Sequence, residues 1–363
     1  MLSGLYQVAR HALFAMEPEV AHEATLAALE RGIYPRPLKG DDTYLSQKVF
    51  GLDFSNPIGI AAGYDKDARV PDAVLGLGCG FAEIGTVTPR PQDGNPKPRV
   101  FRLVKDHGLI NRLGFNNGGH AAALSRLAAR QARGGIVGVN IGANKDSPDR
   151  SADYVQGIKT FNAVASYFTV NISSPNTPGL RDMQAPEALN ELLGRIMAAR
   201  QEIISAGGAR RPIIVKIAPD IAEDDIAPIA DRLRAHAVDG IAVSNTTLSR
   251  AGLTDPQANE TGGLSGRPAF SRSTAMLARV YLATQGEIPL IGIGGIDSPE
   301  TALAKIEAGA TLLQLYTGLI YEGPALISKI KTRLADEARR AGPGGLPTLR
   351  GRKAETWAQR PLV

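Results

Sequence analysis

The stretch Tyr167–Arg181, YFTVNISSPNTPGLR, joins a short β-branched and aromatic run to a segment rich in Asn, Ser, Pro and Gly. The first half has the composition of a buried strand, and the second half that of a loop. We therefore expect Asn171, Ser174 and Asn176 to lie just past the C-terminal end of a strand. In a barrel of parallel strands this end carries the catalytic groups. The stretch thus predicts an active-site loop on an α/β barrel.

Short apolar runs recur along the chain, and Ala/Leu/Arg-rich segments with helical spacing separate most of them. This alternation favours a parallel sheet covered by helices, and eight repeats predict a (β/α)8 TIM barrel. A doubly wound open sheet is the alternative, ranked lower because no early G-x-G-x-x-G turn precedes an acidic residue. The expected strands lie near Ile58–Ala61, Ala82–Gly85, Ile136–Asn140, Phe168–Asn171, Ile213–Ile217, Gly240–Val243, Leu290–Ile293 and Leu312–Leu315.

Three segments are expected outside the bare barrel. The first 40 residues predict two short helices, and the first helix has apolar positions with helical spacing at Leu2, Leu5, Ala9, Leu13 and Met16. The segment Lys97–Asn111 predicts a hairpin inserted after the second strand. We divide the chain into a helical cap (1–40), the barrel (41–340) and a C-terminal tail (341–363).

Composition excludes several classes of function. The net charge is +5, but Lys and Arg are dispersed, so no nucleic-acid partner is expected. The single Cys79 excludes an internal disulfide framework and a Cys-ligated iron–sulfur cluster. We find neither a His/Asp/Glu cluster with metal-ligand spacing nor an apolar run long enough to cross a bilayer. No metal and no transmembrane helix are therefore expected.

Polar residues cluster at the expected strand ends. Small residues at Ala61–Gly63 would let a flat ligand approach the backbone, and Lys66 adds a cation beside it. Lys216 interrupts an apolar strand, and an unpaired buried ammonium is costly, so it should face a partner in the barrel mouth. Amide side chains both donate and accept, which suits a small ring with amide edges. Four asparagines could form such a set: Asn111, Asn171, Asn176 and Asn245.

Gly-rich loops follow the seventh and eighth expected strands, IGIGGIDS and QLYTGLIYEG. Such loops form the usual phosphate-binding site of barrels, because their backbone N–H groups can surround a dianion. Gly295, Tyr316 and Thr317 are therefore our candidates for binding a ligand phosphate. The loops do not distinguish FMN from a sugar phosphate.

The pattern N-x-S-S-P-N-T-x-G-L at 171–180 closely resembles the catalytic loop of dihydroorotate dehydrogenases. A-A-G-x-D-K at 61–66 and P-E-x-A-H-E at 18–23 also resemble motifs of the quinone-using, membrane-associated class. Ser174 falls where that class has its catalytic base, whereas the cytosolic class usually has cysteine there. The resemblance covers residues from about 1 to 330.

The resemblance implies an oxidoreductase that converts (S)-dihydroorotate to orotate, with one FMN per subunit and a membrane quinone as acceptor, in pyrimidine biosynthesis. It implies peripheral attachment to the cytoplasmic side of an inner membrane, and we expect a monomer. Ser174 would take the C5 proton and pass it to water or to the Thr177 hydroxyl, because no histidine lies near it in sequence.

The resemblance also assigns residues to three sites. The flavin would contact Ala62, Gly63, Tyr64, Asp65, Lys66, Thr86, Asn140, Asn171, Lys216, Ser244, Gly266, Gly295, Tyr316 and Thr317. The substrate would contact Lys66, Asn111, Arg112, Leu113, Gly114, Phe115, Asn171, Asn176, Asn245 and Thr246. The quinone head group would lie against His22, Arg102 and Tyr316. We note one departure from the family's pattern, Tyr64 within A-A-G-Y-D-K.

Two other functions stay open at this point. One is a different flavin-dependent barrel, such as a 2-hydroxy acid oxidase, which would need a His–Arg pair that we do not find at the expected barrel mouth. The other is a non-redox barrel, such as a sugar-phosphate isomerase or an aldolase, with Lys216 as base or Schiff-base former. The second would explain the phosphate loops but not the four asparagines or the N-terminal helices.

Overall fold

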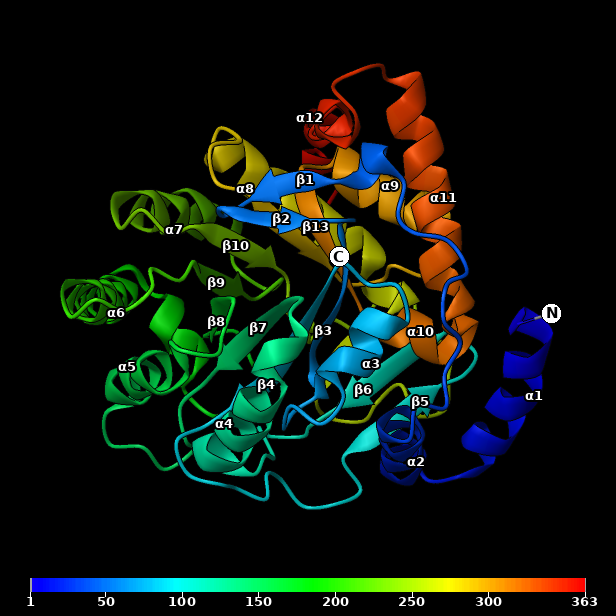
Figure 1. Ribbon diagram of the computed structural model, residues 1–363, viewed down its shortest axis with the longest axis horizontal. Helices are drawn as coiled ribbons and strands as arrows, with labels where there is room; N and C mark the ends of the chain where they lie inside the picture. The colour runs from blue at the N-terminus through cyan, green and yellow to red at the C-terminus, as the bar shows by residue number, and fades with distance from the viewer. Residues whose placement is uncertain (1, 363) are drawn as a thin grey trace.

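The computed structural model describes residues 2–362 and contains a closed barrel of eight parallel strands (Figure 1). Neighbouring strands pair in parallel all the way round, and β10 closes the barrel by pairing with β9. The (β/α)8 prediction is confirmed, and every predicted strand is present. The barrel strands are β3 (Ile58–Asp65), β4 (Phe81–Val87), β7 (Ile136–Ile141), β8 (Tyr167–Asn171), β9 (Ile213–Ile217), β10 (Gly240–Val243), β12 (Leu290–Ile293) and β13 (Ala310–Leu315).

Helices surround the barrel because each has one apolar face that must be buried. In α11, for example, Leu326, Ile330 and Leu334 recur at four-residue spacing and are buried. Helix α9 begins with a capping box in which Ser298 and Thr301 satisfy each other's backbone N–H groups. The surrounding helices are α3 (Pro71–Gly76), α4 (Gly119–Arg130), α5 (Arg150–Phe161), α6 (Pro186–Ser205), α7 (Glu223–Ala235), α8 (Phe270–Ala283), α9 (Pro299–Glu307), α10 (Thr317–Glu322) and α11 (Ala325–Arg340).

The barrel interior changes from apolar to polar along the strands. Toward the N-terminal ends of the strands, Phe81, Tyr167, Ile214 and Leu312 pack into one buried cluster. A short antiparallel hairpin, β1 (Gln47–Val49) and β2 (Leu52–Phe54), joins that cluster through the ring of Phe54. Polar side chains take over toward the C-terminal strand ends. The polar side chains that could bind a ligand therefore lie at that end, where the strands lead into loops.

The predicted hairpin after the second barrel strand is present as β5 (Val100–Leu103) and β6 (Gly108–Asn111). Strand β11 (Gly263–Gly266) adds to its other edge, so the loop after β10 becomes part of a small antiparallel sheet. This sheet brings Asn111, at the end of β6, beside Gly263. The pairing carries a residue from a loop insertion to the same end of the molecule as the barrel strand ends.

Two helices precede the barrel, as predicted: α1 (Leu2–Ala15) and α2 (Pro18–Glu30). Helix α2 is tied down by a two-pronged ion pair in which the buried Arg99 guanidinium donates to both Glu19 oxygens at 2.9 and 3.0 Å. Arg69 adds ion pairs to Glu23 and Glu30 on the same helix. Figure 1 shows α2 beside β5 and α1 farther out. The side chains of Leu2 and Leu5 lie outside the described part.

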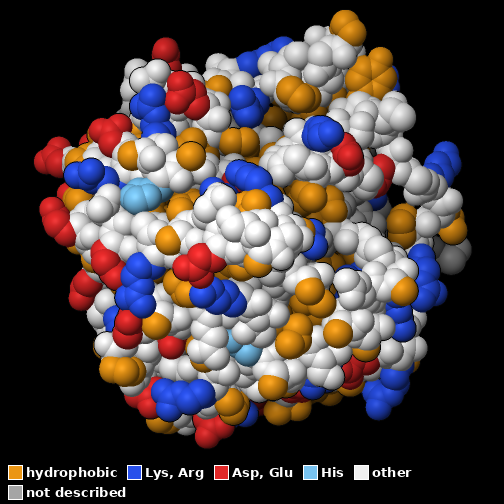
Figure 2. Space-filling view, turned by 60° about the vertical axis from the view of Figure 1, so that its left-hand side comes forward, with side chains coloured by type: hydrophobic (Ala, Val, Ile, Leu, Met, Phe, Trp, Pro, Cys, Tyr) orange, Lys and Arg blue, Asp and Glu red, His pale blue; other side chains and the backbone are white. Residues whose placement is uncertain are grey.

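The C-terminal residues pack back onto the barrel rather than extending from it. Helix α12 (Ala354–Ala358) lies against α8, and the buried Trp357 ring meets Phe270 edge-on at 5.6 Å. On the face shown in Figure 2, basic and acidic side chains are intermingled rather than gathered into one basic patch. Within residues 2–362, no helix is both long and apolar enough to cross a membrane.

Candidate active site

One cavity of about 670 Å³ occupies the C-terminal end of the barrel. Its inner wall comes from the ends of the barrel strands and their loops, and its outer wall from α1 and α2. Ala9 and Leu13 of the first helix line the same space as Ser174 and Lys216. The predicted catalytic and quinone-binding residues and most of the predicted flavin-binding residues therefore meet in one continuous cavity rather than in separate pockets.

The four asparagines predicted as a set are brought together here. The Asn176 amide donates to the Asn111 side-chain oxygen at 3.3 Å, and the Asn245 amide donates toward Asn171 at 3.4 Å. All four line the cavity, although they come from three separate segments: the end of β6, the end of β8 with its loop, and the loop after β10. Their amides can therefore present both donors and acceptors to one small ring.

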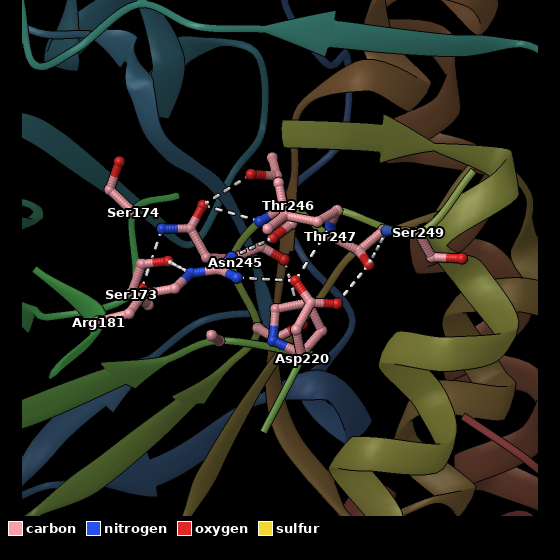
Figure 3. Close-up of polar contacts among 12 residues, drawn as sticks. Ser173, Ser174, Arg181, Asp220, Asn245, Thr246, Thr247 and Ser249 are labelled. Carbon is pink, nitrogen blue, oxygen red and sulfur yellow. Dashed lines mark hydrogen bonds and ion pairs between the residues drawn. The ribbon is translucent and has the colours of Figure 1, made fainter. Parts of the chain in front are cut away.

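Ser174 is 5% exposed and lines the cavity, and its Oγ accepts the Asn176 backbone N–H at 3.2 Å. In Figure 3 its hydroxyl points away from the hydrogen-bonded pair formed by Ser173 and Asn245. Thr177, three residues further along the chain, is also buried, but its hydroxyl forms no hydrogen bond with that of Ser174. The Ser174 hydroxyl is therefore free to face a ligand while the backbone N–H of Asn176 orients it.

Arg181 joins the two loops that carry the substrate-facing residues (Figure 3). Its guanidinium donates to the Ser173 carbonyl at 3.1 Å and to the Thr246 carbonyl at 3.0 Å, and pairs with Asp220 at 2.9 Å. Asp220 also accepts the Thr247 hydroxyl. The loops after β8 and β10 are thus held at a set separation. No local pattern predicts this role, although Arg181 is the last residue of the Tyr167–Arg181 stretch.

A buried carboxylate, Glu83, lies in the barrel below the asparagines. It is 2% exposed and accepts hydrogen bonds from Asn140, Tyr167, Thr169 and Gln314 at 2.8 to 3.0 Å. Four neutral donors around one carboxylate offset much of the cost of burying its charge. Glu83 was not among the predicted site residues, because a single acidic residue inside an apolar strand has no local motif.

A hydrogen-bond chain of uniform direction runs from the cavity to Glu83. The Asn171 amide donates to the Thr86 hydroxyl at 2.9 Å, and Thr86 donates to the Asn140 oxygen at 2.6 Å. The Asn140 amide then donates to Glu83 at 2.9 Å. Because a carboxylate only accepts, it fixes the orientation of each amide above it. The Asn171 oxygen is thereby turned toward Ser173, whose hydroxyl donates to it at 2.9 Å.

Two polar groups at the cavity floor lack partners among the described residues. The Lys216 ammonium, 5% exposed, has no hydrogen bond or ion pair; burial lowers its pKa, and the negative charge of Glu83 partly opposes that shift. The buried side-chain oxygen of Gln314 also has none. Both residues line the cavity. Buried polar groups are normally hydrogen-bonded, so an unpartnered cation and an unpartnered acceptor in one cavity indicate that a polar ligand binds there.

Lys66 is the second cation of the cavity. Its ammonium donates to the Asn116 side-chain oxygen at 3.0 Å. Burial, followed by the nearby Arg99 guanidinium, lowers the pKa of Lys66 to about 8, while Glu19 acts in the opposite direction. Asn116 also lines the cavity but was not among the predicted residues, although it follows the predicted loop directly. The pair offers a cation and an amide to an anionic ligand group.

The predicted phosphate side is built from tight glycine turns. Gly266 has φ of 91°, and a Cβ added there would lie 2.5 Å from the His107 carbonyl oxygen. Gly295 has φ of 71°, and a Cβ there would collide with Phe270. Thr317 begins α10 and its hydroxyl lies 2.9 Å from that of Ser265. All of these residues except Phe270 and His107 line the cavity, leaving bare backbone facing it.

The predicted quinone residues lie between the first two helices and the barrel. His22 meets Tyr64 edge-on at 5.4 Å, and Tyr64 meets Tyr316 edge-on at 5.8 Å. Burial, with Lys66 adding to it, lowers the pKa of His22 to about 4, so its ring is neutral at neutral pH. Arg102 donates to backbone carbonyls at the end of α1, including that of Met16 at 2.7 Å. Aromatic rings therefore connect the helices to the barrel wall.

Three predicted contact residues do not line the cavity. The Arg112 guanidinium turns away from the cavity and pairs with Glu260 at 2.7 Å. Asp65 instead accepts the backbone N–H groups of Arg69 and Val70, both at 2.8 Å. Asn140 lies one layer behind Thr86. The remaining predicted residues line the cavity: Ala62, Gly63, Tyr64, Leu113, Gly114, Phe115, Ser244, Thr246 and those described above.

Comparison with known proteins agrees with this geometry. A family model described as dihydroorotate dehydrogenase matches residues 44–337. Proteins named dihydroorotate dehydrogenase (quinone) from Brucella ovis and Brucella melitensis are 56% identical, with 100% of both chains covered. The ligand-free structure of DHODH from Eimeria tenella is 37% identical with a TM-score of 0.88, covering 95% of this chain and 100% of that one. The structure of DHODH from Eimeria tenella in complex with ferulenol is also 37% identical with a TM-score of 0.88, and the match covers 93% of this chain and 95% of that one. The chain belongs to the dihydroorotate dehydrogenase family, among its quinone-dependent members.

Proposed function

We propose that this protein oxidises (S)-dihydroorotate to orotate in pyrimidine biosynthesis and passes the two electrons to a quinone. The observation that carries the proposal is the single cavity that joins Ser174 and the four asparagines to the space beneath α1 and α2. A substrate and an electron acceptor can both reach one cofactor from such a cavity. Membership of the family supports the same reaction.

FMN is the cofactor that we assign to the cavity. The small residues Ala62 and Gly63 would let its ring lie against backbone, with Lys216 and Gln314 offering a cation and an acceptor to the ring edge. Gly266, Gly295, Tyr316 and Thr317 would surround its phosphate. Bound FMN would supply the acceptor for the hydride that leaves C6 of the substrate. Sequence patterns alone left a sugar phosphate open, and the unpartnered floor groups favour a flavin over it.

The substrate side uses amides and one cation. Asn111, Asn176 and Asn245 would pair with the donor and acceptor edges of the ring. The hydrogen bond from Asn176 to Asn111, and that from Asn245 to the Ser173 hydroxyl, hold them ready to do so. The Lys66 ammonium would face the substrate carboxylate. Ser174 would take the C5 proton, and the Asn176 N–H that it already accepts would help its oxygen to bear the charge. The proton would leave through water or the Thr177 hydroxyl.

The cap would admit the quinone and attach the protein to the membrane. We assign residues 1–40 to this cap, 41–340 to the flavin-binding barrel and 341–363 to the tail. Large hydrophobic side chains concentrate on the cap surface: Val8, Met16, Val20, Ile33 and Leu38 are 42 to 101% exposed. An apolar surface of this kind suits peripheral attachment to a bilayer. We place the protein on the cytoplasmic side of the inner membrane, as a monomer with one FMN.

The test is the visible spectrum of the purified protein without oxygen. A flavin band that dihydroorotate bleaches, and that a soluble quinone restores, would establish substrate, cofactor type and acceptor together. A flavin band that ignores dihydroorotate would contradict the proposed substrate. Absence of a flavin band, even after incubation with FMN, would contradict the cofactor. Sedimentation with anionic vesicles, compared between the natural chain and a Val8→Ser, Val20→Ser variant, tests the membrane attachment.

A further inference from the structure

Lys305, in α9, is a buried cation with no role in the proposed reaction. Its side chain is fully buried, and its ammonium donates to the Ser273 hydroxyl at 2.7 Å and to the Ile293 carbonyl at 3.3 Å. The Phe270 ring lies 5.5 Å from the ammonium. No acidic side chain among the described residues pairs with it. Burial alone lowers the pKa of Lys305 well below its usual range.

An unpaired ammonium in this position is unfavourable, because burial removes its hydration without supplying a negative charge. A methionine of similar length would fill the same space at less cost. The acidic groups of α9 and of the turn before it are already paired: Glu307 with Lys353, Asp297 with Arg267, and Glu300 with Arg333. Of the helices packed against α9, α11 has its acids Asp336 and Glu337 paired with its own arginines, and the charged residues of α8 are arginines, Arg272 and Arg279, which pair with Asp220 and Glu223. None of them compensates Lys305. The missing charge must come from elsewhere, or the amine must stay neutral.

The two partners of Lys305 lead directly to the cavity wall. Ile293 is the last residue of β12, and the Ser273 hydroxyl can donate to the Gly294 carbonyl at 3.1 Å. Gly294 and Gly295 follow, and both line the cavity on the side that we assign to the phosphate. Gly295 packs directly on Phe270, which begins α8. Lys305 therefore lies immediately behind the loop whose front would face a bound phosphate.

We propose that Lys305 supplies, from behind the Gly294–Gly295 loop, the positive charge that makes the site select a phosphate-bearing flavin over the unphosphorylated one. The inference rests on the proposed function in taking FMN as the ligand. The loop offers the phosphate only backbone dipoles, whereas Lys305 offers a full charge through a layer with little screening. The amine gains a proton when the dianion binds, so cofactor binding and proton uptake are coupled.

The test compares FMN with riboflavin, which has the same ring system and no phosphate. Dissociation constants are measured by flavin fluorescence for full-length protein stripped of flavin. We expect Lys305→Met to weaken FMN binding at least tenfold and to change riboflavin binding less than twofold. Lys353→Met, an exposed lysine paired with Glu307, is the matched control and should change neither. Equal weakening of both flavins, or of neither, would overturn the inference.

A second measurement needs no variant and covers the case in which Lys305→Met does not fold. Calorimetric titrations of the natural chain in two buffers of different ionisation enthalpy count the protons taken up. At about pH 8 the FMN phosphate is already a dianion, because its second pKa is about 6. We expect FMN, but not riboflavin, to bring proton uptake, and equal uptake would overturn the inference. If the natural chain bound neither flavin, the proposed function would fall, and this inference with it.

Discussion

The Asn140 amide donates to Glu83 at 2.9 Å while its oxygen accepts the Thr86 hydroxyl at 2.6 Å, so one buried carboxylate sets the orientation of an amide chain that ends in the active site. Glu83 and Asn140 lie on adjacent strands, β4 and β7, with Glu83 in register with Gly138. The chain passes through Asn171 to Ser173. The geometry of the substrate-facing side therefore depends on a residue that no ligand would touch.

Replacing Glu83 by Gln should destabilise the protein strongly. The new NH2 group would face either the Asn140 amide, which donates to one oxygen, or the three groups that donate to the other, so at least one buried donor would lose its acceptor. We expect the free energy of unfolding to fall by about 2 to 4 kcal/mol. Guanidinium unfolding of the two proteins measures this. Glu202→Gln, at an exposed ion pair with Lys159, should change it by less than about 0.5 kcal/mol. A stable Glu83→Gln protein with unchanged kinetics would contradict the role given to the chain.

Replacing Ser174 by Ala should remove the proton acceptor while leaving the fold intact. We expect dihydroorotate to bleach the flavin about 10² to 10⁴ times more slowly, the usual contribution of a positioned base. Stopped-flow absorbance without oxygen isolates this step from quinone reduction. Ser328→Ala, at an exposed position on α11, serves as the control. Near-normal bleaching by Ser174→Ala across pH would show that another group takes the proton.

The affinity for substrate should weaken in alkali, because burial, aided by Arg99, lowers the pKa of Lys66 to about 8. The ammonium is present below that pH and is lost as pH rises through it. A substrate carboxylate then loses its partner, so KM should be flat below about pH 8 and rise by up to tenfold per unit above it. Steady-state KM and kcat from about pH 6 to about pH 10 test this. In Lys66→Met the rise should disappear, and a persistent rise would assign it to another group.

Loosening the cap should separate the two half-reactions. Glu19→Ala removes both oxygens that Arg99 holds at 2.9 and 3.0 Å, and with them the main tie of α2 to the barrel insertion. We expect the KM for quinone to rise by roughly tenfold, equivalent to about 1.4 kcal/mol, with bleaching by dihydroorotate within about twofold of normal. Glu355→Ala, in α12, is the control. Equal loss in both half-reactions would mean that the cap also supports the barrel site.

Acid should destabilise the protein through two histidines whose pKa is lowered in the folded state, the buried His120 and the partly buried His22. Burial lowers the pKa of His120 to about 4, and neither of its ring nitrogens has a partner among the described residues; His22 is lowered to a similar value. The folded state therefore binds fewer protons than the unfolded state between about pH 4 and pH 6.5, and stability falls as pH drops through that window. Each histidine contributes up to about 1.4 kcal/mol per pH unit.

His120→Leu should therefore reduce the loss of stability between about pH 7 and about pH 5. Urea unfolding at the two pH values measures it. His236→Gln, which changes a surface histidine bonded to Asn190, should leave the loss unchanged. An equally steep loss in His120→Leu would place the acid sensitivity in the carboxylates instead.

Local patterns in the sequence are enough to predict the barrel and the identity of most groups at its mouth. Strand composition, helical spacing and loop residues are local, and each acts over a few neighbouring positions. This is why the strand ends carrying Asn171, Lys216 and Asn245 follow from the order of residues alone. The resemblance to the family then assigned roles to them, and the cavity brings them together.

The partner that each polar group takes depends on how the chain folds in three dimensions. Gln314 reaches Glu83 across 231 positions of sequence, and Arg112 turns to Glu260 across 148. Neither choice has a local pattern, because a side chain pairs with whatever group the closed barrel and its inserted sheet bring within about 3 Å. The same is true of Arg181 and of Lys305. Burial then changes the chemistry of each group, since a charge without water depends on the few neighbours left to it.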